Sequence, residues 1–246
     1  MKLKPAILSH LLIAVAILFT STVHAQKNKV LVFAKTAGFH HQSIAVGLPA
    51  LQKLGAENKF AVDTTTNSAV FTAENLKQYA AVIFLNTTGD VLNDAQQAAF
   101  EQYIKAGGGF VGVHAATDTE YAWPWYGQLV GAYFVNHPEQ QEATLQIINQ
   151  KSLATKHLPA TWTRKDEWYN FKNIQTDLNV LIKLDETSYK GGTNGDNHPI
   201  AWYHNFDGGR SFYTGLGHVD GSYTDPMFLK HLLGGIQYAM GQKSME

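Results

Sequence analysis

The chain has 246 residues, with 19 Lys and Arg against 20 Asp and Glu, and a formal charge of −1. No basic patch stands out, which argues against nucleic acid as a partner. The chain has no Cys, so disulfides and thiolate chemistry are excluded. The length beyond the first segment suits one α/β domain with a substantial core.

The first 25 residues have the pattern of a secretory signal peptide. Lys2 and Lys4 precede a largely apolar run at 6–19, and Val23-His24-Ala25 is a small-x-small cleavage site. An uncleaved membrane anchor is the alternative, disfavoured because the apolar run is short for a span. We therefore expect an exported protein, periplasmic or secreted, with no stable membrane span after cleavage. Residues 26–246 are expected to form a single domain.

The next part of the chain alternates predicted strands and helices. Continuous apolar runs are typical of buried parallel strands, and cap residues mark where helices begin. Asn93 with Gln96 forms a capping box. The expected elements are a strand at 30–34, a helix from Ser43 to Leu54 stopped by Gly55, a strand at 60–62, a helix at 74–79 capped by Thr72, a strand at 80–85, a helix from Asn93 to Ala106 and a strand at 110–113.

The second half is less regular. Strands are predicted at 143–148, 180–184, 200–203 and 211–214, and a last helix runs from its cap at Asp225 to Met240, before Gly241. The strand–helix alternation of the first half predicts an α/β fold, a doubly wound, mostly parallel sheet flanked by helices.

Residues 107–118, Gly-Gly-Gly-Phe-Val-Gly-Val-His-Ala-Ala-Thr-Asp, are the most informative stretch. Glycines introduce an apolar strand that ends in a tight segment of small residues. In α/β proteins this arrangement presents one side chain at the carboxyl edge of the sheet, as in a nucleophile elbow. Here that residue is His114, which can serve as a base, an acid or a metal ligand.

Three loops should meet at this edge of the sheet: 36–43, 86–90 and 114–118. They carry His41, Thr87, Thr88 and Asp118 beside His114. An alternative for the threonines is that they only cap the next helix and satisfy turn backbone. Further on, Asp166 and Glu167 stand beside aromatic residues, a setting that suits a carboxylate for acid–base work.

The chain has no local metal-binding motif. A site would have to be assembled by the fold from scattered histidines, with zinc or another first-row divalent ion as the expected metal. The metal-ligand candidates are His41, His114, His137 and His218.

Several motifs together resemble the trehalose-utilisation (ThuA-like) family over nearly all of residues 26–246, in order. The segments that carry the resemblance are Val30–His41, Thr87–Asp90, Gly107–Asp118, Asp166–Phe171, His198–Trp202, Gly208–His218 and Asp225–Ile236.

The resemblance implies a class I glutamine-amidotransferase-like, flavodoxin-like fold. It places His114 where that fold carries a nucleophilic Cys, so glutaminase activity is expected to be lost. His41, His114, Glu167 and His218 match the family's polar positions, whereas His40 falls where the family is more variable. The resemblance also implies a role in sugar catabolism, with keto-glycosides as the expected substrate class.

Two functions are therefore carried forward. In the first, the protein is an enzyme acting on a keto-glycoside or related sugar. His114 and Glu167 move protons, with His41 as a further catalytic residue. His41 and His218 polarise a substrate oxygen, either directly or through a metal. In the second, it is a non-catalytic carbohydrate-binding protein. A peptidase or esterase is disfavoured because neither Ser nor Cys stands at position 114. Expected substrate-binding residues are Thr87, Thr88, Asp118, Trp125, Tyr126, Trp168, Tyr169, His198, Trp202 and His218.

Overall fold

The computed structural model describes residues 28–246, so the predicted signal peptide lies outside the described residues. Within them, nine strands form one sheet in the order β2-β1-β3-β4-β11-β10-β9-β6-β7, and β5 pairs with β8 separately. The strands from β2 to β11 in this order are parallel, and the remaining pairs of the large sheet are antiparallel. The predicted α/β class, with a mostly parallel sheet flanked by helices, is confirmed.

The element bounds are as follows. The strands are β1 (Lys29–Phe33), β2 (Ala61–Thr65), β3 (Ala81–Leu85), β4 (Gly109–Val113), β5 (Tyr133–Asn136), β6 (Gln141–Ile147), β7 (Thr161–Asp166), β8 (Asn170–Lys172), β9 (Asn179–Leu184), β10 (Pro199–Phe206) and β11 (Gly209–Thr214). The helices are α1 (Ile44–Glu57), α2 (Ala73–Leu76), α3 (Asp94–Lys105), α4 (Pro124–Val130) and α5 (Pro226–Ala239).

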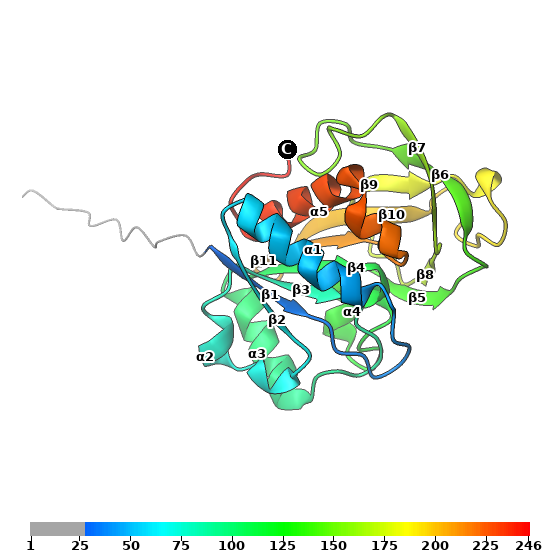
Figure 1. Ribbon diagram of the computed structural model, residues 1–246. Coiled ribbons are helices and arrows are strands. Elements are labelled where there is room, and N and C mark those ends of the chain that lie inside the picture. The colour runs from blue at the N-terminus through cyan, green and yellow to red at the C-terminus, as the bar shows by residue number, and fades with distance from the viewer. Residues whose placement is uncertain (1–27) are drawn as a thin grey trace, which may run out of the picture.

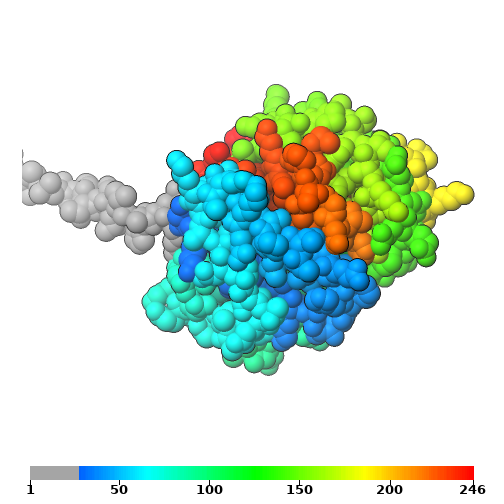
Figure 2. Space-filling model, in the orientation of Figure 1, coloured from blue at the N-terminus to red at the C-terminus, as the bar shows by residue number. Residues whose placement is uncertain are grey.

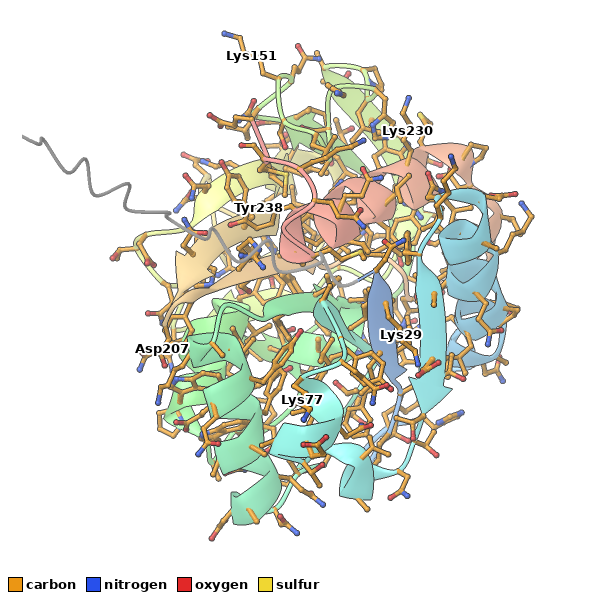
Figure 3. The ribbon with its side chains drawn as sticks, turned by 90° about the vertical axis from the view of Figure 1, so that its left-hand side faces the viewer. Lys29, Lys77, Lys151, Asp207, Lys230 and Tyr238 are labelled. Carbon is orange, nitrogen blue, oxygen red and sulfur yellow. The ribbon has the colours of Figure 1, made fainter. Side chains whose placement is uncertain are left out.

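The helices cover both faces of the sheet. Helices α1 and α5 lie side by side on one face, and α2, α3 and α4 lie on the other (Figure 1). The view turned by 90° shows the same layers, with Tyr238 of α5 on one side of the sheet and Lys77, at the end of α2, on the other (Figure 3). All five residues of β3 and of β4 are buried, as expected for strands covered on both faces.

Local sequence explains where several helices begin. Asn93 and Gln96 form the predicted capping box, and Thr72 and Asp225 cap α2 and α5 through their side chains. Ser43 stands at the start of α1 but makes no side-chain cap, because its hydroxyl donates instead to the Gly217 carbonyl. This bond ties the start of α1 to the segment that follows β11.

The predicted helix stop at Gly55 is wrong, since α1 continues to Glu57. A Cβ at position 55 would lie 2.5 Å from Val62 Cγ2, so this glycine allows α1 to pack closely on β2. Strands β5, β7 and β8 and helix α4 were not predicted from the sequence. In the described part of the chain, no helix combines the length and the apolar character needed to cross a membrane.

The parallel strands bring separate loops to one edge of the sheet. Bridges between Thr36 and Thr88 and between Gly89 and Thr119 join the loops after β1, β3 and β4. The segment after β11 lies beside them, because β11 pairs in parallel with β4. This edge carries the polar cluster described next.

Candidate metal centre at the carboxyl edge of the sheet

Four side chains from four separate segments converge at this edge. His41 lies between β1 and α1, His114 follows β4, Glu167 follows β7 and His218 follows β11. Each offers one ligand atom, and these atoms all lie within 4.8 Å of one another. The structure therefore brings together the four polar positions that the family resemblance had selected.

The contacts centre on one carboxylate oxygen. Glu167 Oε2 lies 3.3 Å from His114 Nε2 and 3.0 Å from His218 Nδ1. The two histidine atoms are themselves 3.2 Å apart. The His41 ring centre lies 5.0 Å from that of His114 and 5.1 Å from that of His218. Three imidazoles thus surround one buried carboxylate.

The backbone and a carbonyl fix the orientation of His114. Its φ of 48° lies in the left-handed region, which is uncommon outside glycine and turns the chain sharply after β4. Its Nδ1 donates to the Gly215 carbonyl at 2.8 Å. Since Nδ1 is engaged by this carbonyl, Nε2 is the nitrogen that faces Glu167 and the one available to a metal.

Asp166 organises the other two segments. Its Oδ1 accepts from the backbone N–H groups of Glu167 and His218, both at 3.1 Å, and its Oδ2 accepts from Gly217 at 3.2 Å. Arg164 lies 3.3 Å from the same Oδ2. This buried carboxylate therefore holds the end of β7 against the segment after β11 and positions both Glu167 and His218.

The electrostatics favour a metal-ligand set. Burial alone would raise the pKa of Glu167, but hydrogen bonds and charges from His114 and His218 outweigh it and hold this pKa well below its usual range. Burial, with a smaller contribution from the same two histidines, lowers the pKa of His41 to about 3. His41 is then neutral near pH 7, and its Nδ1 is buried without a hydrogen-bond partner. Three imidazoles and one carboxylate suit zinc or a similar divalent ion.

A model of the ThuA family, described as trehalose utilisation, matches residues 29–239. The chain belongs to the ThuA family. Among curated proteins, none matches the sequence.

One solved structure supports the same assignment, and a second shares the fold. A ThuA-like protein from Bacteroides uniformis ATCC 8492 has 27% identity and a TM-score of 0.77, with 90% of this chain and 94% of that chain covered. A ThuA-like protein from Parabacteroides merdae ATCC 43184 has 20% identity and a TM-score of 0.73, with 89% and 91% covered. The second likeness is evidence for the fold alone.

Histidines 137 and 198 have different places in this ThuA-family chain. His137 is 42% exposed and lies outside the four-residue cluster, although its Nδ1 is 3.4 Å from Glu167 Oε1. His198 is buried; its Nε2 donates to the Tyr169 carbonyl at 2.8 Å, and its Nδ1 lies 2.7 Å from Glu186. The Tyr169 ring centre is 4.2 Å from that of His114, so His198 supports a residue that packs on the cluster.

The predicted polar substrate contacts Thr87, Thr88 and Asp118 lie in the converging loops, where each bonds to protein. Thr87 Oγ1 is 2.9 Å from that of Thr119, and Thr88 Oγ1 donates to the Phe39 carbonyl at 2.8 Å. Asp118 accepts from Tyr121 at 2.7 Å, and burial raises its pKa. These bonds serve to hold the loops, and a role in binding substrate stays a prediction.

The predicted aromatic walls lie elsewhere. Tyr126, Trp168 and Trp202 are fully buried, and their polar atoms donate to backbone carbonyls, which leaves no exposed ring face for a sugar. Trp125 donates to Asp207, which precedes β11 and so lies at the opposite end of that strand from His218. Lys29 and Asp207, both labelled in Figure 3, mark that amino-terminal edge.

Sequence reasoning missed Gln140 and Phe39. Gln140 Nε2 lies 2.7 Å from His218 Nε2, and the Phe39 ring centre is 4.9 Å from that of His41. Phe39 could have been predicted from the sequence, because it stands two residues before His41 in the first loop. Gln140 could not, since only the path of the chain between β5 and β6 brings it to His218.

Proposed function

We propose that this ThuA-family chain is an enzyme that acts on a keto-glycoside or a related sugar, with a divalent metal such as zinc at His41, His114, Glu167 and His218. The observation that carries the proposal is the convergence of one ligand atom from each residue within 4.8 Å. Support for a sugar substrate comes from the family, which is described by trehalose utilisation.

The chemistry follows from the donor set. A bound divalent ion would supply Lewis-acid polarisation of a carbonyl oxygen on the sugar. Glu167 contributes the negative charge of the site, and the Gly215 carbonyl holds the His114 ring in a fixed orientation. His137 stands at the exposed margin, 3.4 Å from Glu167 Oε1. We assign it the transfer of a proton between the substrate and solvent.

The proposal includes no glutaminase step. An acyl-enzyme needs a nucleophile at the elbow, and position 114 holds an imidazole in a chain that has no Cys.

We also propose that the protein is exported, on the signal-peptide pattern of residues 1–25. Expression with a Sec-competent host should yield a mature chain that starts at Gln26 by intact mass, and a retained residue 1 would contradict export by cleavage.

Metal analysis combined with turnover tests the enzyme proposal. Protein purified without chelator should contain about one zinc or similar ion per chain and should convert a 3-keto-glycoside, and both properties should be lost in His114→Ala. His157→Ala is the matched control, because His157 contacts the Met227 carbonyl away from the cluster. Full turnover by His114→Ala would overturn the role of His114.

The rival function, a non-catalytic carbohydrate-binding protein, has a distinct outcome in the same experiment. It predicts that the wild-type chain binds the sugar but forms no product, with or without added divalent metals. We favour the enzyme because three histidine nitrogens and one carboxylate oxygen lie within 4.8 Å of one another, an arrangement suited to a metal that binding a sugar does not by itself require.

A further inference from the structure

A hollow of about 630 Å³ opens beside the candidate metal centre. Its volume is within the range of small-molecule sites. His218, the most exposed of the four clustered residues, lines both the cluster and the hollow. The full lining is Phe39, His40, Gln42, Gln140, His218, Val219 and Asp220.

Three segments distant in sequence form this hollow. They are the loop between β1 and α1, the loop between β5 and β6 and the segment after β11. Figure 2 shows the blue, green and orange parts of the surface adjoining on the face turned to the viewer. The hollow is therefore made by the same chain segments that supply the cluster, and it is the side from which a ligand can reach His218.

The lining has the chemistry of a site for a neutral, hydroxylated ring. Phe39 is 66% exposed, and its ring lies 4.9 Å from that of His41, so an apolar face stands next to the cluster. Two amides and the Asp220 carboxylate offer donors and acceptors for hydroxyl groups. The lining includes no Lys or Arg, the residues that bind phosphate groups.

We infer that this hollow is the ring subsite of the enzyme: it binds a neutral, unphosphorylated pyranose, with Phe39 against the ring face and Gln42, Gln140 and Asp220 at its hydroxyls. This inference rests on the proposed function and deepens it by naming the substrate class and the residues that select it. The lining holds His40 and His218 but no Lys or Arg, and His218 is engaged in the cluster, so a sugar phosphate would bring its dianion next to Asp220 without a guanidinium or ammonium partner.

Gln140 links the ring subsite to the metal centre. Its Nε2 lies 2.7 Å from His218 Nε2, so one of the two atoms must accept. Since amide oxygen and nitrogen positions are interchangeable by a flip, the Gln140 oxygen can accept from a protonated His218 Nε2. That arrangement engages His218 through Nε2 and leaves Nδ1, 3.0 Å from Glu167, as the nitrogen available to a metal.

The test uses the metal-loaded protein purified after expression of the whole gene product. Calorimetry should detect binding of methyl α-D-glucopyranoside or of the 3-keto-glycoside, and at least tenfold weaker binding of glucose 6-phosphate. Phe39→Ala and Gln42→Ala should each raise Kd or KM at least tenfold, with metal content and Tm unchanged. Ile148→Ala, which truncates an exposed apolar side chain at the end of β6, should leave all these values unchanged.

Two results would overturn the subsite: wild-type affinity in both Phe39→Ala and Gln42→Ala, or glucose 6-phosphate binding as tightly as the neutral sugar. These results are distinguishable from failure of the proposed function. If the wild-type protein turns over the sugar and both variants keep the wild-type Kd and KM, the subsite is rejected and the catalytic proposal stands. Loss of sugar binding in the variants, in a protein that forms no product, would support the subsite and reject the catalytic proposal.

Discussion

His114 stands where the family resemblance places a nucleophilic Cys. Its two ring nitrogens contact Gly215 and Glu167, so the imidazole fits this position. The backbone at this residue is left-handed, with φ of 48°, as in a nucleophile elbow, but an imidazole is a poor group for forming the acyl-enzyme that such an elbow serves. Instead, the sharp turn aims Nε2 at Glu167 and leaves Nδ1 to the Gly215 carbonyl. The same backbone geometry thus presents a nitrogen that could bind a metal in place of a nucleophile.

Asp166 is expected to control the metal affinity of the cluster through its backbone contacts. Asp166→Asn would place an amide where Oδ2 now accepts from Gly217 and would remove the charge that faces Arg164. Because Asp166 positions Glu167 and His218 without belonging to the four-residue cluster, we expect zinc affinity to fall about 10- to 100-fold. Competition with a chromophoric chelator measures this affinity.

The matched control for Asp166 is Asp185→Asn. Asp185 also accepts a backbone N–H, that of Thr187, but it does so in a turn after β9 away from the cluster. Zinc affinity equal to wild type in Asp166→Asn, with the same value in the control, would show that Asp166 has no part in positioning the ligands.

Among the elements, the segment after β11 is the one on which the site most depends. Gly217 has φ of +112°, and a Cβ there would lie 3.0 Å from the Tyr223 hydroxyl. Gly217→Ala should therefore destabilise the fold by about 1–3 kcal/mol and lower zinc affinity, since it shifts the adjacent His218. Gly221→Ala is the control, because nothing lies within 4 Å of a Cβ at position 221.

Chemical denaturation and zinc titration of both glycine variants check this prediction. Equal stability of Gly217→Ala and Gly221→Ala would mean that the backbone at 217 can relax without cost. A stability loss without any change in zinc affinity would mean that His218 is held by other contacts, of which Asp166 and Gln140 are the candidates.

The predictability of the elements followed the strength of local signals. Apolar runs such as β3 and caps such as Asn93 were correctly predicted, because burial on both faces and capping act within a few residues. Strand β7 was missed, since its sequence carries Arg164 and Lys165, and Asp166 is buried only because Arg164 and the segment after β11 satisfy it.

For the whole molecule, the candidate site was predictable in part. The carboxyl edge and His114 followed from the sequence pattern, which also offered Glu167 and His218 as candidates. The family resemblance then selected Glu167 and His218, together with His41 and His114, as one set. The aromatic sugar contacts were predicted less well. Trp168 and Trp202 are residue types suited to binding sugars, but both are buried in the core. Composition does not distinguish a buried ring from an exposed one, and Phe39 is the ring that stays exposed beside His41.

His231 provides a prediction for the stability of the whole molecule. It lies in α5, where its Nδ1 donates to the Ala154 carbonyl at 2.9 Å and its ring packs on Phe212 of β11. Its Nε2 is buried without a partner, and burial lowers the pKa of His231 to about 4. The folded state therefore holds a neutral ring that the unfolded chain would protonate below about pH 6.5.

The sign of the effect follows from linkage. His231 contributes its full stabilisation above pH 6.5, and this is lost as the pH falls toward 4, because the unfolded state then binds the proton more readily. Between pH 7.5 and 5 the loss should be about 2 kcal/mol. His231→Gln keeps an N–H donor for Ala154 but cannot titrate. Urea unfolding at both pH values should show a smaller decrease for the variant by about that amount, whereas equal decreases in the two proteins would show that His231 is protonated in the folded state.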